Sequence, residues 1–132
     1  MKRIRIVALI AGLATDIVGT ILYSIALYVV LVVRHAHIGE RPEVILQKLT
    51  SDVPFMLVGY LGGIGFTFLG AYVTAKLSRP NSVFNAFIFG LIGTLAGFLF
   101  ISINPLWYTI LCELTILPVS LIPGYLLQRK AV

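Results

Sequence analysis

The chain of 132 residues is 59% hydrophobic and only 11% charged, with a formal net charge of +5. A soluble domain of this length needs far more charge to cover its surface, so the composition excludes a soluble globular protein and predicts an integral membrane protein. The basic residues stand at the ends of apolar runs, where lysine and arginine meet lipid headgroups. The expected partner is therefore the lipid bilayer and not nucleic acid.

Four apolar runs are each long enough to cross a hydrocarbon core of about 30 Å, at about 1.5 Å of helix per residue. They cover residues 6–33, 53–77, 83–103 and 106–127, and residues 34–52 form the expected outer loop. Since the second and third connections are short, the helices they join must be antiparallel neighbours. The sequence predicts an all-α membrane protein, a four-transmembrane-helix antiparallel bundle in a single domain over residues 1–132.

The starts of the later spans are marked by capping residues. Ser51 or Asp52 is expected to cap the second span, with Pro54 in its first turn. Asn81 and Asn104 stand just ahead of the third and fourth spans in the same way.

Lysine and arginine are unequally distributed between the two sides of this predicted bundle. Because cytoplasmic segments carry the excess of positive charge, both termini are expected to be cytoplasmic. The more basic side carries Lys2, Arg3, Arg5, Lys76, Arg79, Arg129 and Lys130, and the other side carries Arg34, Arg41 and Lys48.

The outer loop contains residue types that bind metals. His35 and His37 form a His-x-His pattern with Glu40 and Glu43 nearby, and such groups bind zinc or copper. Two histidines in one loop are also common as interfacial polar residues, so we expect no metal site or cofactor and keep the two histidines as weak candidates. Residues 42–49 are expected to form a short helix on the membrane surface.

Small residues recur at helical spacing on every predicted span. Because lipid provides no hydrophobic drive for helix association, small residues that let backbones approach are the usual packing device. Close helix packing is therefore the main interpretation, and a narrow cavity lined by glycines is the alternative. The expected packing positions are Gly12, Gly19, Gly59, Gly63, Gly70, Gly90, Gly93 and Gly97.

Two acidic residues, Asp16 and Glu113, lie inside apolar runs. A central aspartate costs about 2.5–3.5 kcal/mol on insertion scales, and each Leu, Ile, Val or Phe offsets about 0.3–0.6 kcal/mol, so the first span inserts regardless. Counted from the cytoplasmic edge, Asp16 lies about 15 Å deep and Glu113 about 21 Å deep, roughly one helical turn apart. If their polar stripes face one interior, the two carboxyl groups meet and share a proton, because both cannot stay ionised in a low dielectric.

Pro118 adds a backbone group to this hypothesis. Its missing N–H leaves the carbonyl of Leu114 free, next to Glu113, and its ring is expected to kink the fourth helix. An acid beside a freed carbonyl at mid-depth is suited to a proton or cation site. The alternative is that each acid is protonated and hydrogen-bonded to neighbouring hydroxyl groups as structural polar glue.

Two stretches of the chain carry a family resemblance. LGAYVTAKLSRP (Leu69 to Pro80) with the following NAFIFGLIG, and PLWYTILCELTILPVSLIPGYLLQRK (Pro105 to Lys130), resemble small four-helix bacterial inner-membrane proteins of uncharacterised role. In that family the second helix ends in a Gly-Gly-Tyr-x-Ala-Ala-Arg-like sequence, where this chain has Ala71 for the second glycine and Lys76 for the arginine. The resemblance implies the topology and a place in the cytoplasmic (inner) membrane, but no activity.

The stretch ATDIVGTILY (Ala14 to Tyr23) is similar to the first helix of the small multidrug resistance transporters, in which an acid carries proton and cationic drug. That resemblance implies that Asp16 is a coupling carboxylate. The chain departs from those transporters in using aspartate for glutamate, in its long first connection and in its firm charge bias. Spans two to four contain no counterpart.

The sequence leaves two function classes open. The first is a structural or accessory membrane protein whose glycine faces pack against itself or against a membrane-protein partner. The second is a small proton- or cation-coupled transporter centred on Asp16 and Glu113. An enzyme is not expected, because HExxH, GxSxG, Walker-loop and CxxC motifs are absent from the sequence.

Overall fold

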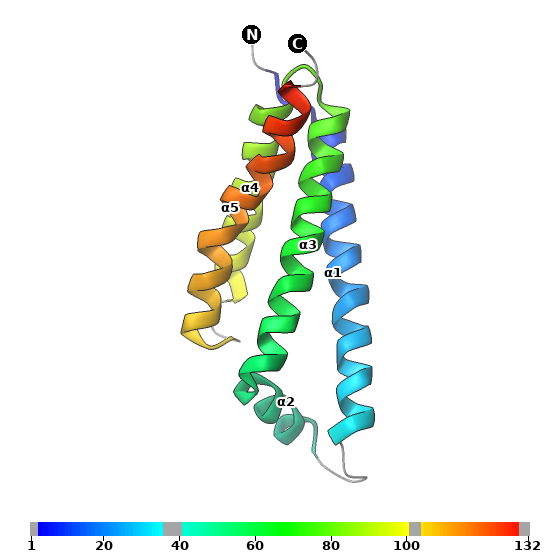
Figure 1. The fold of residues 1–132 in the computed structure, drawn as a ribbon, viewed down its shortest axis with the longest axis vertical. Helices are drawn as coiled ribbons and strands as arrows, with labels where there is room; N and C mark the ends of the chain where they lie inside the picture. The colour runs from blue at the N-terminus through cyan, green and yellow to red at the C-terminus, as the bar shows by residue number, and fades with distance from the viewer. Residues whose placement is uncertain (1–2, 36–40, 101–103, 130–132) are drawn as a thin grey trace.

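The computed structural model describes residues 3–35, 41–100 and 104–129, and the regular structure in these ranges is helical (Figure 1). The elements are α1 (Ile6–His35), α2 (Pro42–Ser51), α3 (Val53–Leu77), α4 (Ser82–Gly97), the 3-10 helix η1 (Phe98–Phe100) and α5 (Leu106–Arg129). By length and composition α1, α3 and α5 can cross a membrane, and α4 is a shorter apolar helix. The all-α membrane class expected from the sequence is confirmed at this level.

Three predicted spans have different boundaries in the structure, and the last of them continues beyond residue 127 to Arg129. The first helix continues beyond residue 33 to His35, and the short helix expected inside the loop is present as α2. The third span was expected over residues 83–103, but α4 ends at Gly97 and the chain tightens into η1. Glycines at positions 93 and 97 favour this early end, because glycine is a weak helix former. Residues 101–103 lie outside the described part of the chain.

The long helices form two antiparallel pairs, α1 with α3 and α4 with α5. The pairs are joined because α3 also packs against both α4 and α5, and α1 touches α4. Among the described residues, α1 and α5 do not contact each other. The start of α1 and the end of α5 lie at one end of the molecule, and α2 lies at the opposite end (Figure 1).

The start of α3 follows the capping signal in the sequence. The Asp52 side chain accepts a hydrogen bond from the backbone N–H of Phe55 at 3.2 Å, and Pro54 stands in the first turn. At the start of α5, the carbonyl of Pro105 accepts two backbone N–H groups at 3.0 and 3.1 Å. The Asp52 bond satisfies a backbone N–H group that a helix start otherwise leaves without a partner.

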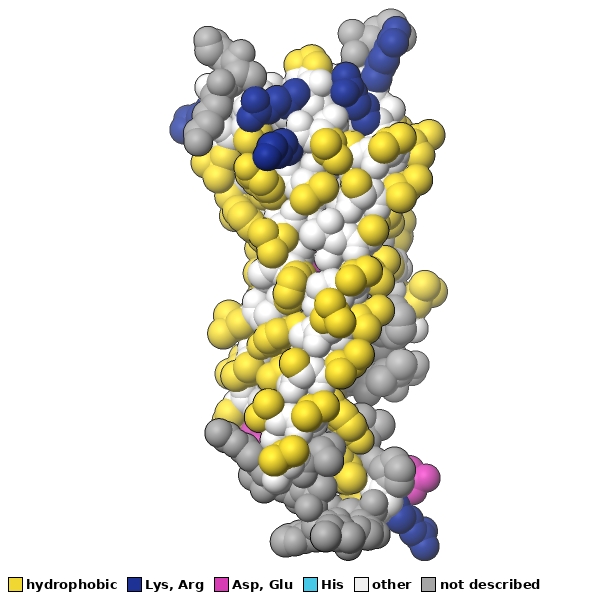
Figure 2. All heavy atoms as spheres, turned by 90° about the vertical axis from the view of Figure 1, so that its right-hand side faces the viewer, with side chains coloured by type: hydrophobic (Ala, Val, Ile, Leu, Met, Phe, Trp, Pro, Cys, Tyr) yellow, Lys and Arg dark blue, Asp and Glu magenta, His cyan; other side chains and the backbone are white. Residues whose placement is uncertain are grey.

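The interior of the bundle is built mainly from small side chains. Most large aliphatic side chains point outward, and Figure 2 shows hydrophobic side chains spread along the flank between the two ends. Such a surface suits a hydrocarbon surrounding, in which apolar side chains need no burial. The buried apolar residues form two clusters, one of Leu9, Ala71 and Phe89 and the other of Ala75, Ala86 and Leu127.

Glycines hold the helix pairs at short range. A Cβ atom on Gly12 would stand 2.5 Å from the carbonyl oxygen of Gly70, and one on Gly70 would stand 2.7 Å from the carbonyl oxygen of Gly12. Between α4 and α5, a Cβ on Gly124 would stand 2.9 Å from the Cα atom of Val83. Any larger residue at these positions forces one backbone away from the other.

The predicted packing glycines are not equivalent in the structure. Gly12, Gly19, Gly70, Gly90, Gly93 and Gly97 each have a neighbouring helix within 3.4 Å of the Cβ position. The nearest atom to the Cβ position of Gly59 is the Tyr108 hydroxyl at 3.8 Å, and nothing lies within 4 Å at Gly63. In this part of α3, the ring of Tyr23 on α1 lies against Gly62 instead.

Replacing Gly12 by Ala is expected to destabilise the fold by about 1–3 kcal/mol, because a methyl group does not fit between α1 and α3. Gly63→Ala is the matched control, since its site is open and alanine is favoured over glycine in a helix by about 1 kcal/mol. Unfolding in mixed micelles with increasing SDS, followed by circular dichroism, measures both variants. Equal stability of the two variants would contradict the close approach of α1 to α3.

Candidate functional site

Asp16 lies on the face of α1 that meets α3. Its Oδ1 atom accepts hydrogen bonds from Thr20 Oγ1 on α1 and from Thr67 Oγ1 on α3, both at 3.4 Å. Gly70 permits this arrangement, because a Cβ atom there would stand 3.0 Å from the Cβ atom of Asp16. The half-buried carboxyl group is therefore held in a polar cluster between two helices.

The same helix pair has polar contacts on either side of Asp16. Toward the termini, the buried Thr74 Oγ1 donates to the carbonyl oxygen of Ala8 at 3.2 Å. Toward α2, the Tyr23 hydroxyl donates to the carbonyl oxygen of Val58 at 2.9 Å. Hydrogen bonds therefore join α1 to α3 at three levels, and Asp16 is at the middle one.

Glu113 lies in the other helix pair, where its carboxyl group packs against Gly97 at the end of α4. A Cβ atom on Gly97 would stand 2.8 Å from Glu113 Cδ and 3.2 Å from its Oε2. Within the described ranges, Oε2 is buried without a hydrogen-bond partner, and so is Thr94 Oγ1, one turn earlier on α4. Buried polar atoms without partners are uncommon in folded proteins, so this site differs from the hydrogen-bonded Asp16 cluster.

The structure does not bring Asp16 and Glu113 together. Asp16 faces α3 and Glu113 faces α4, and their own helices are not in contact in the described part of the chain. The Phe89 ring reaches Gly70 at the level of Asp16, whereas Gly97 lies eight residues further along α4, about 12 Å away. The acids are thus about two turns apart along the bundle, where the sequence suggested one, and they do not form a pair that shares a proton.

Leu114 and Pro118 lie on the outer face of α5. The Leu114 side chain is 70% exposed and Pro118 is also exposed, while Glu113 on the same helix packs against α4. α5 continues through Pro118 to Arg129. The Leu114 and Pro118 side chains therefore lie on a different face of α5 from Glu113, and the role expected for the Leu114 carbonyl group stays a prediction.

The histidine candidates for a metal site fall outside the described residues. Residue 37 is within the undescribed range 36–40, and for His35 only the backbone at the end of α1 is described. In the ranges that the structure does describe, no three His, Cys, Asp or Glu side chains are grouped closely enough to hold a metal ion.

Asn85 on α4 is a buried polar residue that sequence reasoning missed. Its Oδ1 accepts a hydrogen bond from the backbone N–H of Arg5 at 2.8 Å, and its Nδ2 donates to the carbonyl oxygens of Arg3 and Asn81 at 3.2 and 3.0 Å. These bonds fix the segment before α1 against the first turn of α4. The available signal was an asparagine in the apolar stretch NAFIFG, where a buried amide requires partners.

Comparison of the chain with protein-family models, with curated proteins and with solved structures gave no match. The fold itself defines the class: a helical protein with three helices of membrane-spanning length and one shorter apolar helix among its described residues. Both resemblances noted in the sequence stay predictions.

Thr67→Val removes the hydroxyl group that α3 donates to Asp16 while keeping the shape of the side chain. We expect a loss of stability of about 0.6 kcal/mol, and at most about 1.7 kcal/mol, as for other hydrogen bonds between membrane helices. Thr115→Val is the control, because the Thr115 hydroxyl bonds carbonyl groups of its own helix at 2.8 and 3.0 Å. If SDS unfolding shows no difference between the variants, the contact between Thr67 and Asp16 does not stabilise the fold.

Proposed function

We propose that the chain is a small multi-pass integral membrane protein with a structural or accessory role, packing against a second copy or a membrane-protein partner. The observation that carries this proposal is the Asp16 cluster. The acid whose position best suits transport accepts two threonine hydroxyl groups inside a tight glycine interface. Such a carboxyl group acts as an interhelical hydrogen-bond acceptor, which is a structural role.

The proposal includes four crossings of the membrane. α4 has 16 residues and η1 has three. At about 1.5 Å per residue of α-helix and about 2.0 Å per residue of 3-10 helix, the two together extend about 30 Å. That length equals a typical hydrocarbon core of about 30 Å, so α4 with η1 is long enough to return the chain between α3 and α5.

The charge distribution supports cytoplasmic termini. Figure 2 shows most of the lysine and arginine side chains in view at the end where α1 begins and α5 ends (Figure 1), with basic side-chain atoms also at the opposite end. Basic residues are concentrated on the cytoplasmic side of membrane proteins. Together with the family resemblance, this favours the inner membrane. The exposed basic residues described at this end are Arg3, Arg5, Lys76, Arg79 and Arg129.

A second candidate function, a proton- or cation-coupled transporter, is supported by Glu113. Its buried Oε2 lacks a hydrogen-bond partner among the described groups, and Thr94 nearby on α4 has the same property. An acid in this condition is suited to gain and lose a proton when its surroundings change. In a transporter of this kind, Asp16 and Glu113 would be separate proton or cation sites at different depths of the bundle and not a pair.

Asp16→Asn keeps an oxygen that can accept the two threonine hydroxyl groups and removes the ionisable group. On the structural proposal this variant is expected to match the wild type in SDS unfolding within about 0.5 kcal/mol. Asp16→Ala removes the acceptor and is expected to cost about 1 kcal/mol. If Asn and Ala destabilise the protein equally, the hydrogen bonds are not what Asp16 contributes.

Ion flux into proteoliposomes separates the two candidate functions. On the structural proposal, vesicles containing the wild type show no more cation-driven change of internal pH than empty vesicles. A flux that is lost in Glu113→Gln but kept in Glu43→Gln, whose exposed acid lies on α2, would establish the transporter instead. Loss of the same flux in Asp16→Asn would add Asp16 to the transport pathway.

A further inference from the structure

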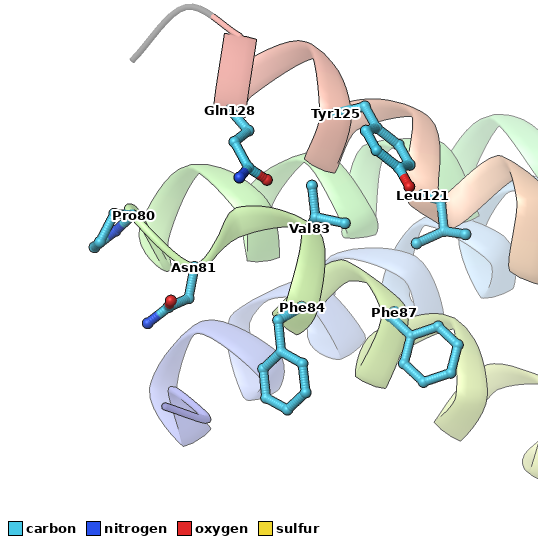
Figure 3. A pocket seen from close by; sticks show the side chains of 8 residues that line it. All are labelled: Pro80, Asn81, Val83, Phe84, Phe87, Leu121, Tyr125 and Gln128. Atoms are coloured by element: carbon cyan, nitrogen blue, oxygen red, sulfur yellow. The ribbon is translucent and has the colours of Figure 1, made fainter. Parts of the chain in front are cut away.

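A groove runs along the outside of the bundle where the start of α4 packs beside the end of α5 (Figure 3). Its volume is about 570 Å³. Figure 3 shows side chains from both helices along it, with Gln128, Tyr125 and Leu121 coming from α5. Its principal lining residues are Asn81, Phe84, Phe87, Leu121, Tyr125 and Gln128.

The groove changes in polarity along its length. Asn81 and Gln128, whose side chains carry amide groups, stand at the end nearest the chain termini. Phe84, Phe87 and Leu121 lie progressively further from that end along their helices. A polar mouth that leads into an apolar channel parallel to the helices matches an amphiphile whose headgroup lies at the membrane edge.

Two exposed arginines are direct sequence neighbours of residues that line the mouth of the groove. Exposed Arg79 directly precedes the lining residue Pro80, and exposed Arg129 directly follows Gln128. The described acidic residues lie elsewhere, two in the helix interfaces and two at the end with α2. The positive end of the α4 dipole faces the same mouth, and its first turn contains no acid.

Asn81 supports a binding role for this mouth. It stands at the position before α4 where asparagine usually caps the helix, but its side chain makes no capping hydrogen bond. The amide group instead lines the groove (Figure 3), where it can donate to a ligand. Amide hydrogen-bond donors and apolar side chains therefore line one groove, and two exposed arginines adjoin it in the sequence.

We propose that this groove binds one anionic phospholipid, with its phosphate between Arg79 and Arg129 and an acyl chain along Phe84, Phe87 and Leu121. The apolar channel selects a lipid over a soluble phosphate, and the two arginines select an anionic headgroup over a zwitterionic one. The inference goes beyond the proposed function, because the groove is distinct from the Asp16 and Glu113 sites and serves a structural protein or a transporter equally.

Native mass spectrometry of the full chain in detergent tests the proposal by counting bound lipids. The probes are phosphatidylglycerol and phosphatidylcholine with the same acyl chains. The wild type is expected to bind one phosphatidylglycerol more tightly than phosphatidylcholine. The double variant R79Q/R129Q is expected to bind phosphatidylglycerol about 25-fold more weakly, from a factor of about five for each arginine.

Two control variants separate the groove from general surface effects. R3Q/K76Q removes the same charge from the same end of the bundle and is expected to keep the tight phosphatidylglycerol. L121W fills the apolar channel and is expected to lose the tightly bound phosphatidylglycerol. L126W, at an exposed position of the same helix, is expected to keep this lipid. An unchanged elution volume in size-exclusion chromatography shows that each variant is folded.

Three outcomes would overturn the proposal. One is equal affinity of the wild type for the two lipids. Another is an equal loss of phosphatidylglycerol in both charge variants, which would mean that any basic surface suffices. The last is displacement of the lipid by glycerol phosphate at a matching concentration, which would mean that the acyl channel contributes nothing.

Discussion

The close approach of α1 to α3 at Gly12 and Gly70 is the contact on which the other features of the bundle depend. Hydrocarbon does not drive helices together, so the contact needs backbones near enough for dispersion forces and hydrogen bonds. Because Gly12 and Gly70 have no side chains, the two backbones can come this close, and Asp16 comes within hydrogen-bond distance of Thr67. The ring of Phe89 from α4 packs against Gly70, and this contact connects the two helix pairs.

The two acids within the apolar helices, Asp16 and Glu113, differ in their hydrogen bonding. Asp16 is held by threonine hydroxyl groups from two helices, so its carboxyl group contributes to the contact between α1 and α3. Glu113 fills the space left by a glycine and keeps a carboxyl oxygen without a partner in the described structure. One acid strengthens a helix interface, and the other leaves a polar atom unsatisfied in a second interface.

Composition and local chemistry were enough to predict the helical membrane class and the capping of α3 by Asp52. Sequence could not predict which helix faces meet. Depth counted along separate helices placed Asp16 and Glu113 one turn apart, because the count contains no information about how the pairs are offset. Spacing on α3 pointed to Gly63, but α1 meets Gly62 because crossing helices change the face they share along their length. The cap expected at Asn81 is absent, and the backbone there (φ −93°, ψ 38°) is outside the extended region that a capping residue usually adopts.

The bonds made by Asn85 have a consequence for biogenesis. The segment around Arg3 and Arg5 is synthesised before α4, which carries its partner amide. A nascent chain can form the α1/α3 hairpin, with its glycine contact and its hydrogen bonds, before α4 has been translated. Arg5 Nη1 can already donate to the carbonyl oxygen of Leu77 at the end of α3, whereas the bonds to Asn85 can form only after α4 has been synthesised.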